Sequence, residues 1–357
     1  MPKQTRVFRL DAKLPDGAAI GVAGRTILAG ALVAFPTETV YGLGANAMDA
    51  AAVAKIFAAK GRPANDPLIA HIANFEQLPL VARDIPDLAL ELAQQFWPGP
   101  LTLVLKKSGG IPDNLTAGLD TVALRMPNHP VAQALLRAAA RPIAAPSANK
   151  FSRPSPTRAQ HVLDDLAGLV DVLLDAGPTS IGVESTILSL VDDPPRLLRP
   201  GGLSLEALRA LCPALDYAPH YLGDDQVAPA PGAMLRHYSP RARLLLFSGA
   251  DEAAVSAAMR AEIARCDNVG LLASDADALQ FADLNIPIER LGANAEEAAL
   301  RLFAAMRALD RRGLDTIVAR APEKQGLGLA LWDRLLRAAA GSLIEVSADN
   351  IENYVPK

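Results

Sequence analysis

Cationic side chains stand at the end of one predicted helix. Lys60 and Arg62 flank Gly61 where a helix expected over 49–61 ends. Two cations on alternate positions of a turn can hold neighbouring phosphate groups, because hydrogen bonds between charged partners are about twice as strong as neutral ones. Cations are favourable at any helix C-terminus, so the spacing alone leaves a structural role open.

Small polar side chains follow a predicted strand at 142–146. Ser147 and Asn149 come after the apolar run Pro-Ile-Ala-Ala. Alternate residues of an extended chain point to the same side, so both side chains are expected to face one pocket. A Ser/Asn turn after a strand is the plainer alternative. Ser155 and Thr157 either extend that pocket or cap the next helix, expected over 157–166.

A guanidinium interrupts the otherwise apolar strand predicted at 121–126. Arg125 requires a partner there, because burying an unpaired charge is costly. Its planar fork suits a carboxylate, supplied either by a structural Asp or Glu or by an amino-acid ligand. Thr121, four residues earlier, lies on the same strand face. His71 is the one histidine in the predicted strand 67–72, and such a residue is usually a satisfied core or surface group.

More polar residues lie where predicted strands begin or end. Gly42 and Gly44 permit close approach of a ligand to the backbone, although a plain turn also explains them. Strand ends in an open α/β sheet meet at one edge, so we expect one pocket, and a nucleoside triphosphate fits it best. The remaining candidates are Thr37, Thr39, Tyr41, Ser185 and Arg199.

Alternating strand-like and helix-like segments predict an α/β protein with two domains. Residues 1–212 are expected to form a mixed sheet with surrounding helices, and 213–241 is a Pro- and Gly-rich linker. Residues 242–357 predict a smaller Rossmann-like α/β domain. That domain has no GxGxxG turn, so dinucleotide binding there is unsupported.

Composition narrows the class of protein. Half of the 357 residues are hydrophobic and the net charge is −4, which argues against a dedicated nucleic-acid coat. Two distant cysteines, Cys212 and Cys266, fit a reducing compartment, and neither a signal peptide nor a membrane span is predicted. We therefore expect a cytoplasmic protein. The sequence has no GxxxxGK[ST], HExxH, GxSxG or kinase signature, so any ATP is bound by a different type of site.

Several motifs occur together in one order: FPTETVYGLG (35–44), KGRP (60–63), DPLIAHI (66–72), WPGPLTLVL (97–105), ALRMPNHP (123–130), PSAN (146–149), GVESTIL (182–188) and LRPG (198–201). Jointly they resemble the YrdC-type family of threonylcarbamoyl-AMP synthases. The linker motif PGAMLRHYSPRA (231–242) and GLGLALWDRLLRAA (326–339) resemble the long, two-domain branch of that family. The resemblance runs from about residue 25 to the C-terminus.

The resemblance implies a nucleotidyltransferase with a YrdC-like twisted mixed sheet around an open cavity. Its members make L-threonylcarbamoyladenylate from L-threonine, bicarbonate and ATP and release pyrophosphate. The product feeds a threonylcarbamoyl-transferring complex that acts on adenosine 37 of tRNA. Mg²⁺ is implied as cofactor, held mainly by the ATP phosphates, and its protein ligands are left undefined. Direct tRNA binding has little support in the sequence.

The resemblance also implies site residues. Lys60 and Arg62 match a Lys-Arg-Ser-Asn signature and are the expected catalytic cations. The threonine side is expected to consist of Thr39, His71, Arg125, Ala145 and Ser185. The nucleotide side is expected to consist of Lys60, Arg62, Asp66, Thr121, Ser147, Asn149, Ser155, Arg199, Arg236 and His237. One departure is the order Asn65-Asp66-Pro67, where the family commonly has Asn directly before the Pro. Asp66 there would contact ATP through its backbone, repel phosphate or help to hold Mg²⁺.

Three other functions compete with this interpretation. An RNA-binding module would use a basic cavity. The negative net charge of the chain and the lack of an aromatic RNP-like stretch argue against this function. A carbamoyl-transferring enzyme shares related domains, but those proteins carry Cys-rich regions. The second domain is either a structural or regulatory lid or a catalytic partner.

Overall fold

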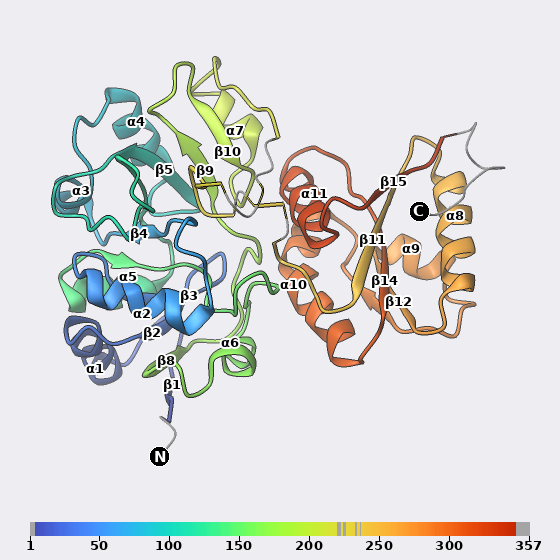
Figure 1. Cartoon of the computed structure of the whole chain (residues 1–357), viewed down its shortest axis with the longest axis horizontal. Helices are drawn as coiled ribbons and strands as arrows, with labels where there is room; N and C mark the ends of the chain where they lie inside the picture. Colours follow the sequence, from blue (N-terminus) through green and yellow to red (C-terminus); the bar gives the residue numbers. More distant parts are fainter. Residues whose placement is uncertain (1–3, 220–222, 224–225, 233, 236, 348–357) are drawn as a thin grey trace. The chain divides into compact units, whose positions relative to one another are not determined.

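The computed structural model describes residues 4–219, 223, 226–232, 234, 235 and 237–347 (Figure 1). The chain divides into two compact units. One comprises Met1–Phe151 and Ser155–Met234, and the other Ser152–Pro154 and Leu235–Lys357. Within the described ranges, no helix is long and apolar enough to cross a membrane.

The first unit contains a mixed sheet and the helices that pack on it. Its elements are β1 (Arg6–Arg9), α1 (Gly17–Leu28), β2 (Val33–Pro36), β3 (Tyr41–Asn46), α2 (Ala50–Lys60), β4 (Ile69–His71), the 3₁₀ turn η1 (Phe75–Gln77), α3 (Leu78–Val81), α4 (Asp87–Phe96), β5 (Leu101–Lys106), β6 (Thr121–Arg125), α5 (Pro130–Ala139), β7 (Ile143–Ala144), α6 (Ala159–Leu166), β8 (Val172–Asp175), β9 (Thr186–Ser189), β10 (Arg196–Arg199) and α7 (Leu205–Arg209).

Ten strands form this sheet in the order β1-β8-β2-β3-β7-β4-β6-β5-β9-β10. Parallel pairs such as β4 with β6 and β5 with β9 alternate with antiparallel pairs such as β5 with β6. The result confirms the α/β class and the mixed sheet predicted from the sequence.

The two faces of the sheet are covered differently. One face packs in a continuous core on α2, α4 and α6, with Leu43, Leu103 and Leu124 among its buried residues. On the other face, α1 and α5 cover only the half that includes β2 and β8. The rest of that face, formed by β4, β6, β5 and β9, holds a small apolar cluster with Ala230 of the linker. The candidate site residues His71, Thr121 and Arg125 lie on this part of the sheet.

Local signals located the helix that carries Lys60. The Asp49 side chain accepts hydrogen bonds from the backbone N–H groups of Ala51 and Ala52 at the start of α2, and Gly61 ends the helix in the left-handed region at φ 64°. Both boundaries confirm the prediction over 49–61.

The glycine-rich segment after β2 is a strand, although the sequence suggested a turn or a ligand contact. β3 pairs antiparallel with β2. A Cβ at Gly44 would lie 2.8 Å from the Phe35 ring and 2.9 Å from Ile143 Cγ2, so this glycine makes room for protein packing. The predicted strand at 142–146 is shorter than expected and comprises only β7. Helix α1 and strand β1 were not predicted.

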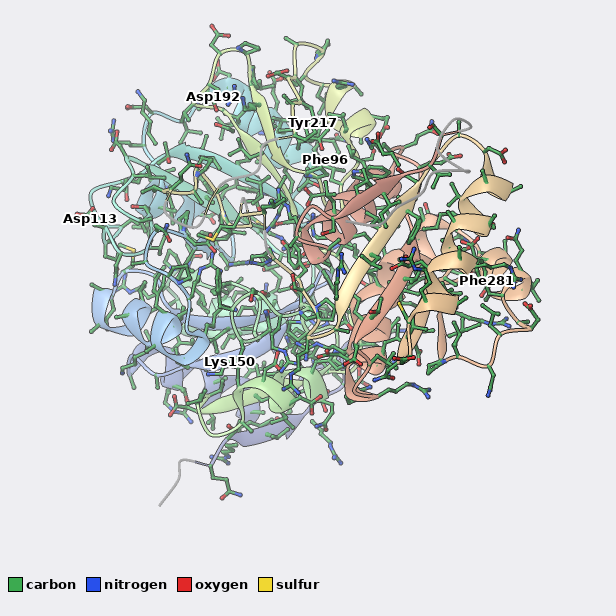
Figure 2. All side chains as sticks on the ribbon, turned by 45° about the vertical axis from the view of Figure 1, so that its right-hand side comes forward. Phe96, Asp113, Lys150, Asp192, Tyr217 and Phe281 are labelled. Atoms are coloured by element: carbon green, nitrogen blue, oxygen red, sulfur yellow. The ribbon has the colours of Figure 1, made fainter. Side chains whose placement is uncertain are left out.

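The second unit is a parallel sheet with helices. It contains β11 (Arg243–Ser248), α8 (Glu252–Arg265), β12 (Val269–Ala273), α9 (Asp275–Gln280), β13 (Ile288–Arg290), α10 (Ala295–Arg311), β14 (Thr316–Arg320), α11 (Leu327–Ala338) and β15 (Leu343–Glu345). The strand order is β13-β12-β14-β11-β15. Phe281, labelled in Figure 2, is buried in its core, and the Arg260 guanidinium lies 4.9 Å from the ring centroid. All strand pairs of this sheet are parallel, as in the predicted Rossmann-like domain, but β14 lies between β11 and β12, which differs from the classic Rossmann strand order.

Gly201, the last residue of the LRPG motif, lies close against the backbone at the start of β9. A Cβ there would lie 2.4 Å from Glu184 O, Ser185 C and Thr186 N. These are backbone atoms and cannot rotate away, so we expect Gly201→Ala to destabilise the first unit by about 1–3 kcal/mol in urea unfolding. The control is Gly17→Ala at the start of α1, where no atom lies within 4 Å, and it should be neutral or stabilising. Equal stability of the two variants would contradict this packing.

Candidate active site

Strand register places four polar side chains and Ile187 in one row across β4, β6, β5, β9 and β10. His71 pairs with Arg125, Arg125 with Thr102, Thr102 with Ile187, and Ile187 with Arg199. Directly paired residues of neighbouring strands share a face. The row therefore brings together side chains from positions 71 to 199 of the sequence, as one convergent site requires.

An apolar floor adjoins this row. It consists of Ile69, Val104, Ala123 and Ile187, and Ala230 of the linker packs on it. Ala123 lies between Arg125 and Thr121 on β6, so Thr121 is on the same face, at the far side of the floor. Thr121 and Arg125 are thus separated by apolar surface.

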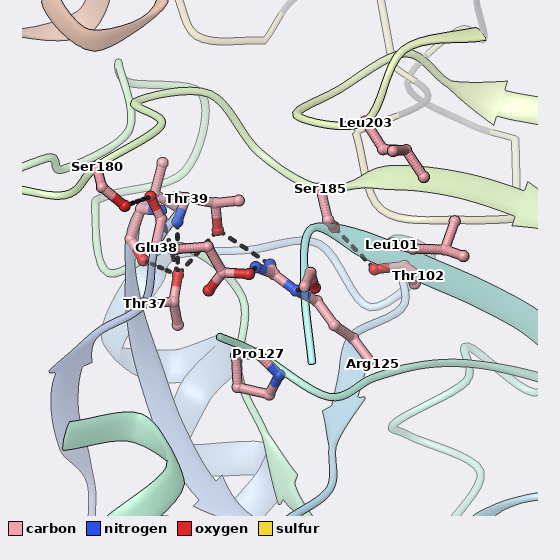
Figure 3. Close-up of polar contacts among 12 residues, drawn as sticks. Thr37, Glu38, Thr39, Leu101, Thr102, Arg125, Pro127, Ser180, Ser185 and Leu203 are labelled. Carbon is pink, nitrogen blue, oxygen red and sulfur yellow. Dashed lines mark hydrogen bonds and ion pairs between the residues drawn. The ribbon is translucent and has the colours of Figure 1, made fainter. Parts of the chain in front are cut away.

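Arg125 ends β6 with its guanidinium almost fully buried. Nη2 lies 2.5 Å from Glu38 Oε1, Nη1 donates to Thr39 Oγ1 at 3.0 Å, and Nε donates to the Gly99 carbonyl at 3.0 Å (Figure 3). The sequence left open whether the partner of Arg125 is a structural carboxylate or a ligand. In the structure, Glu38 supplies a structural carboxylate. Thr39 is held in turn by the Thr37 hydroxyl, 2.8 Å away.

His71 lies beside Arg125 in the row and is neutral at physiological pH. Burial and the neighbouring Arg125 charge lower its pKa to about 3. Its Nδ1 is 3.2 Å from the Ile69 carbonyl, which accepts a hydrogen bond when the ring carries its proton on Nδ1. The Phe35 ring packs edge-on against it. A neutral ring avoids repulsion with the guanidinium.

Lys60 reaches from the end of α2 to the loop after β7. Its Nζ lies 2.5 Å from the Ser147 carbonyl and 2.6 Å from the Asn149 carbonyl, and its own carbonyl accepts from Phe151 N. Burial and the Arg62 charge lower the pKa of Lys60 well below its usual value. The lysine thus fixes the Ser/Asn loop through the backbone of that loop.

Arg62 holds the segment that leads into β4. Nε donates to the Asp66 carbonyl at 2.9 Å, Nη2 donates to the Pro67 carbonyl at 2.7 Å, and Nη2 lies 2.9 Å from Asp66 Oδ1. Burial raises the pKa of Asp66, while the Arg62 and Lys60 charges act in the opposite direction. Asp66 is fully buried against Arg62.

Arg199 joins the loop before β9 to the linker. Its guanidinium donates to the Ser185 carbonyl at 2.9 Å and to the Pro231 carbonyl at 3.1 Å. The Ser185 hydroxyl is also 2.8 Å from Thr102 Oγ1, and this pair appears beside Arg125 in Figure 3. Ser155 donates a hydrogen bond to Glu184. These contacts link the predicted threonine-side and nucleotide-side residues through one network.

Most of the predicted site residues belong to the first unit, and contacts connect many of them. Ala145 continues past β7, with its N–H bonded to the Ile69 carbonyl at 2.9 Å. His237 lies in the second unit, where its ring contacts Tyr238. Arg236 lies outside the described residues. Their role in nucleotide binding stays a prediction.

Three buried residues of the site were not singled out from the sequence. Glu38 lies between Thr37 and Thr39, Thr102 is the one hydroxyl in the apolar run of β5, and Glu184 directly precedes Ser185. A polar residue within an apolar strand was the available signal for Thr102. Glu38 and Glu184 could have been found because each adjoins a flagged hydroxyl.

Comparisons with known proteins identify the family. A model described as telomere recombination, covering Sua5, YciO and YrdC, matches residues 25–201, and one described as threonylcarbamoyl-AMP synthase, C-terminal domain, matches 203–340. The threonylcarbamoyl-AMP synthase of Pyrococcus abyssi is 47% identical over 334 residues, which cover 92% of this chain and 96% of that protein. This chain belongs to the threonylcarbamoyl-AMP synthase family.

Further relatives agree with this. The threonylcarbamoyl-AMP synthase of Bacillus subtilis is 44% identical over 315 residues, covering 88% of this chain and 90% of that protein. The crystal structure of P. abyssi Sua5 complexed with L-threonine matches with a TM-score of 0.89 and 44% identity, covering 96% of this chain and 100% of that one. The family resemblance inferred from the sequence motifs is confirmed.

Lys60 should contribute to stability as well as to ligand binding. Lys60→Met removes the ammonium and its hydrogen bonds to the Ser147 and Asn149 carbonyls, so we expect a loss of about 2–4 kcal/mol in urea unfolding. Lys55 on the same helix also donates to a carbonyl, that of Gly30, but is exposed. Lys55→Met should therefore cost less than about 1 kcal/mol. Equal losses would show that Lys60 does not anchor the loop.

His71 should make the fold sensitive to acid. An unfolded histidine binds a proton below pH 6.5, whereas folded His71 does so only near pH 3, so stability falls as pH drops between these values. From pH 6.5 to 5 the loss is about 2 kcal/mol. We expect His71→Asn to lose this part of the pH dependence, measured by urea unfolding at both pH values. An unchanged slope would mean that His71 is protonated in the folded state.

Proposed function

We propose that this member of the threonylcarbamoyl-AMP synthase family is a nucleotidyltransferase that makes L-threonylcarbamoyladenylate from L-threonine, bicarbonate and ATP. The observation that carries the proposal is the row of His71, Arg125, Thr102 and Arg199 on one sheet face, next to the loop fixed by Lys60. Such a row offers a small zwitterion and a polyphosphate adjoining positions.

Arg125 is the proposed partner of the threonine carboxylate. Its contacts with the described residues use one N–H of each guanidinium nitrogen. A guanidinium has five N–H groups, so one on each terminal nitrogen is available for a ligand. Thr39 and Ser185 hydroxyls lie within the same network and would orient the rest of the amino acid.

Nucleotide binding is proposed for the other side of the site. Lys60 and Arg62 supply positive charge, and Ser147 and Asn149 supply polar groups near it. Both cations are nearly excluded from water, where their attraction for phosphate is less screened.

The proposed reaction needs no covalent enzyme intermediate. The neutral threonine amine forms a C–N bond with bicarbonate and one water is lost, which gives the carbamate. A carbamate oxygen then attacks the α-phosphorus in line, a P–O bond forms, and the bond to pyrophosphate breaks. This chemistry depends on positioning and charge neutralisation, which the buried cations and hydroxyls would provide.

Mg²⁺ is proposed to enter with ATP. The described residues offer no cluster of three or more carboxylate, histidine or cysteine side chains, and Asp66 is already paired with Arg62. The phosphate oxygens would therefore supply most of the ligands, as is usual for this ion. The ion would neutralise phosphate charge.

The product determines the kind of partner. An acyl adenylate is an activated mixed anhydride, so a transferase that accepts the threonylcarbamoyl group must consume it. We propose the tRNA threonylcarbamoyl-transferring complex in this role and a cytoplasmic location.

The test is pyrophosphate release in the presence of ATP, Mg²⁺, bicarbonate and each amino acid in turn. We expect release with threonine, dependent on bicarbonate. Release without any amino acid, or equally with all of them, would refute the proposed function.

Arg125→Lys should weaken the use of threonine. Lysine cannot form the two-pronged contact, so we expect kcat/KM for threonine to fall about 10- to 150-fold, as for the loss of one charge-assisted hydrogen bond. The control is Arg196→Lys on β10, whose side chain is 53% exposed and lies 3.9 Å from Asp216. That variant should stay within twofold. Unchanged kcat/KM for Arg125→Lys would remove Arg125 from the threonine site.

A further inference from the structure

We infer that Glu38 is a substrate-contacting residue that binds the α-ammonium group of the amino acid. The inference rests on the proposed function and adds a residue to it. Glu38 lies in the turn between β2 and β3, and its side chain is 6% exposed (Figure 3). A carboxylate so deeply buried requires partners for both oxygens.

Only one oxygen of Glu38 is satisfied. Oε1 accepts from Arg125, whereas Oε2 is buried and has no hydrogen-bond partner in the described part of the chain. An unmade bond to a buried charged group costs more than one to a neutral group. Oε2 therefore favours a ligand that brings a donor, and above all a cationic donor.

The backbone fixes where Oε2 lies. The Glu38 carbonyl accepts from Ser180 N at 3.1 Å and Ile181 N at 2.7 Å, and Thr37 bonds the Val40 carbonyl across the turn. These hydrogen bonds fix the backbone of the turn, and the contact with Arg125 fixes the carboxylate. The negative charge of the Glu38 carboxylate therefore lies next to the positive charge of the Arg125 guanidinium.

This pair of charges complements a zwitterion. An α-amino acid carries its carboxylate and ammonium on one carbon, so the carboxylate can meet Arg125 while the ammonium meets Glu38. His129, the N-cap of α5, is the other titratable group that senses Glu38: burial lowers its pKa and the Glu38 charge acts in the opposite direction. Its Nδ1 accepts from Val131 N, and no hydrogen bond joins it to Glu38 in the described structure.

A structural role alone would give a different outcome from ammonium binding. If Glu38 only orients Arg125, its loss weakens every carboxylate ligand equally. If it binds the ammonium, its loss weakens threonine selectively. The probe that separates these cases is 3-hydroxybutyrate of matching β-carbon configuration, which keeps the carboxylate and hydroxyl of threonine and lacks the ammonium.

The experiment compares the full-length protein with Glu38→Gln. Gln can still accept from Arg125, but its amide N–H₂ faces the ammonium with a donor. We measure the Kd of L-threonine by calorimetry and that of 3-hydroxybutyrate by competition. The wild-type ratio of the two should be about tenfold or more, and it should fall about tenfold in the variant. An unchanged ratio would overturn the inference and leave the proposed function standing.

Two further variants complete the design. Glu262→Gln on α8 in the second unit removes another buried carboxylate with an unpartnered Oε2, and it should leave the ratio unchanged. If Glu38→Gln does not fold, Glu38→Asp carries the test, because the shortened carboxylate should lower the ratio and an unaltered ratio would overturn the inference. If the wild type binds no threonine, the proposed function fails, and this inference fails with it.

Discussion

The site depends on keeping four cations almost wholly out of water. Lys60, Arg62, Arg125 and Arg199 are each at least nine-tenths buried in one unit. Burial of a charge carries a large desolvation cost that partners must offset. Lys60, Arg125 and Arg199 each donate to a main-chain carbonyl of a distant segment, and Arg62 donates to the nearby Asp66 and Pro67 carbonyls. Arg62 and Arg125 also meet a carboxylate. The cations thereby hold the loops of the site together.

Local features of the chain were predictable. The helix that carries Lys60 begins at Asp49 and ends at Gly61, and both are signals that act within a few residues. The strand bearing Arg125 followed from its apolar run. β3 was not predicted, because Gly42 and Gly44 suggested a turn or a ligand contact. Gly44 is required by the Phe35 ring and Ile143, which belong to other strands and cannot be placed from local sequence.

The site itself was only partly predictable. Residue types and motif order pointed to the cations and hydroxyls, but register decides which of them meet. Thr102 joins Arg125 only because β5 and β6 pair as they do. Likewise, Arg125 was expected to need a carboxylate, and the two possible sources remained open. The structure places Glu38 there, from a strand turn 87 positions away.

The way Lys60 holds its loop has a consequence for how such enzymes diverge. The lysine contacts carbonyl oxygens, which every amino acid carries, and not the side chains at positions 147 and 149. Substitutions at position 147 can therefore change what the loop recognises without removing the contacts of Lys60, whereas the Asn149 side chain itself donates to the Lys150 carbonyl at 2.7 Å. The Lys60 contacts that position the loop are thus separate from the Ser147 side chain. Ligand preference at that side chain can change in evolution or by design while these contacts stay the same.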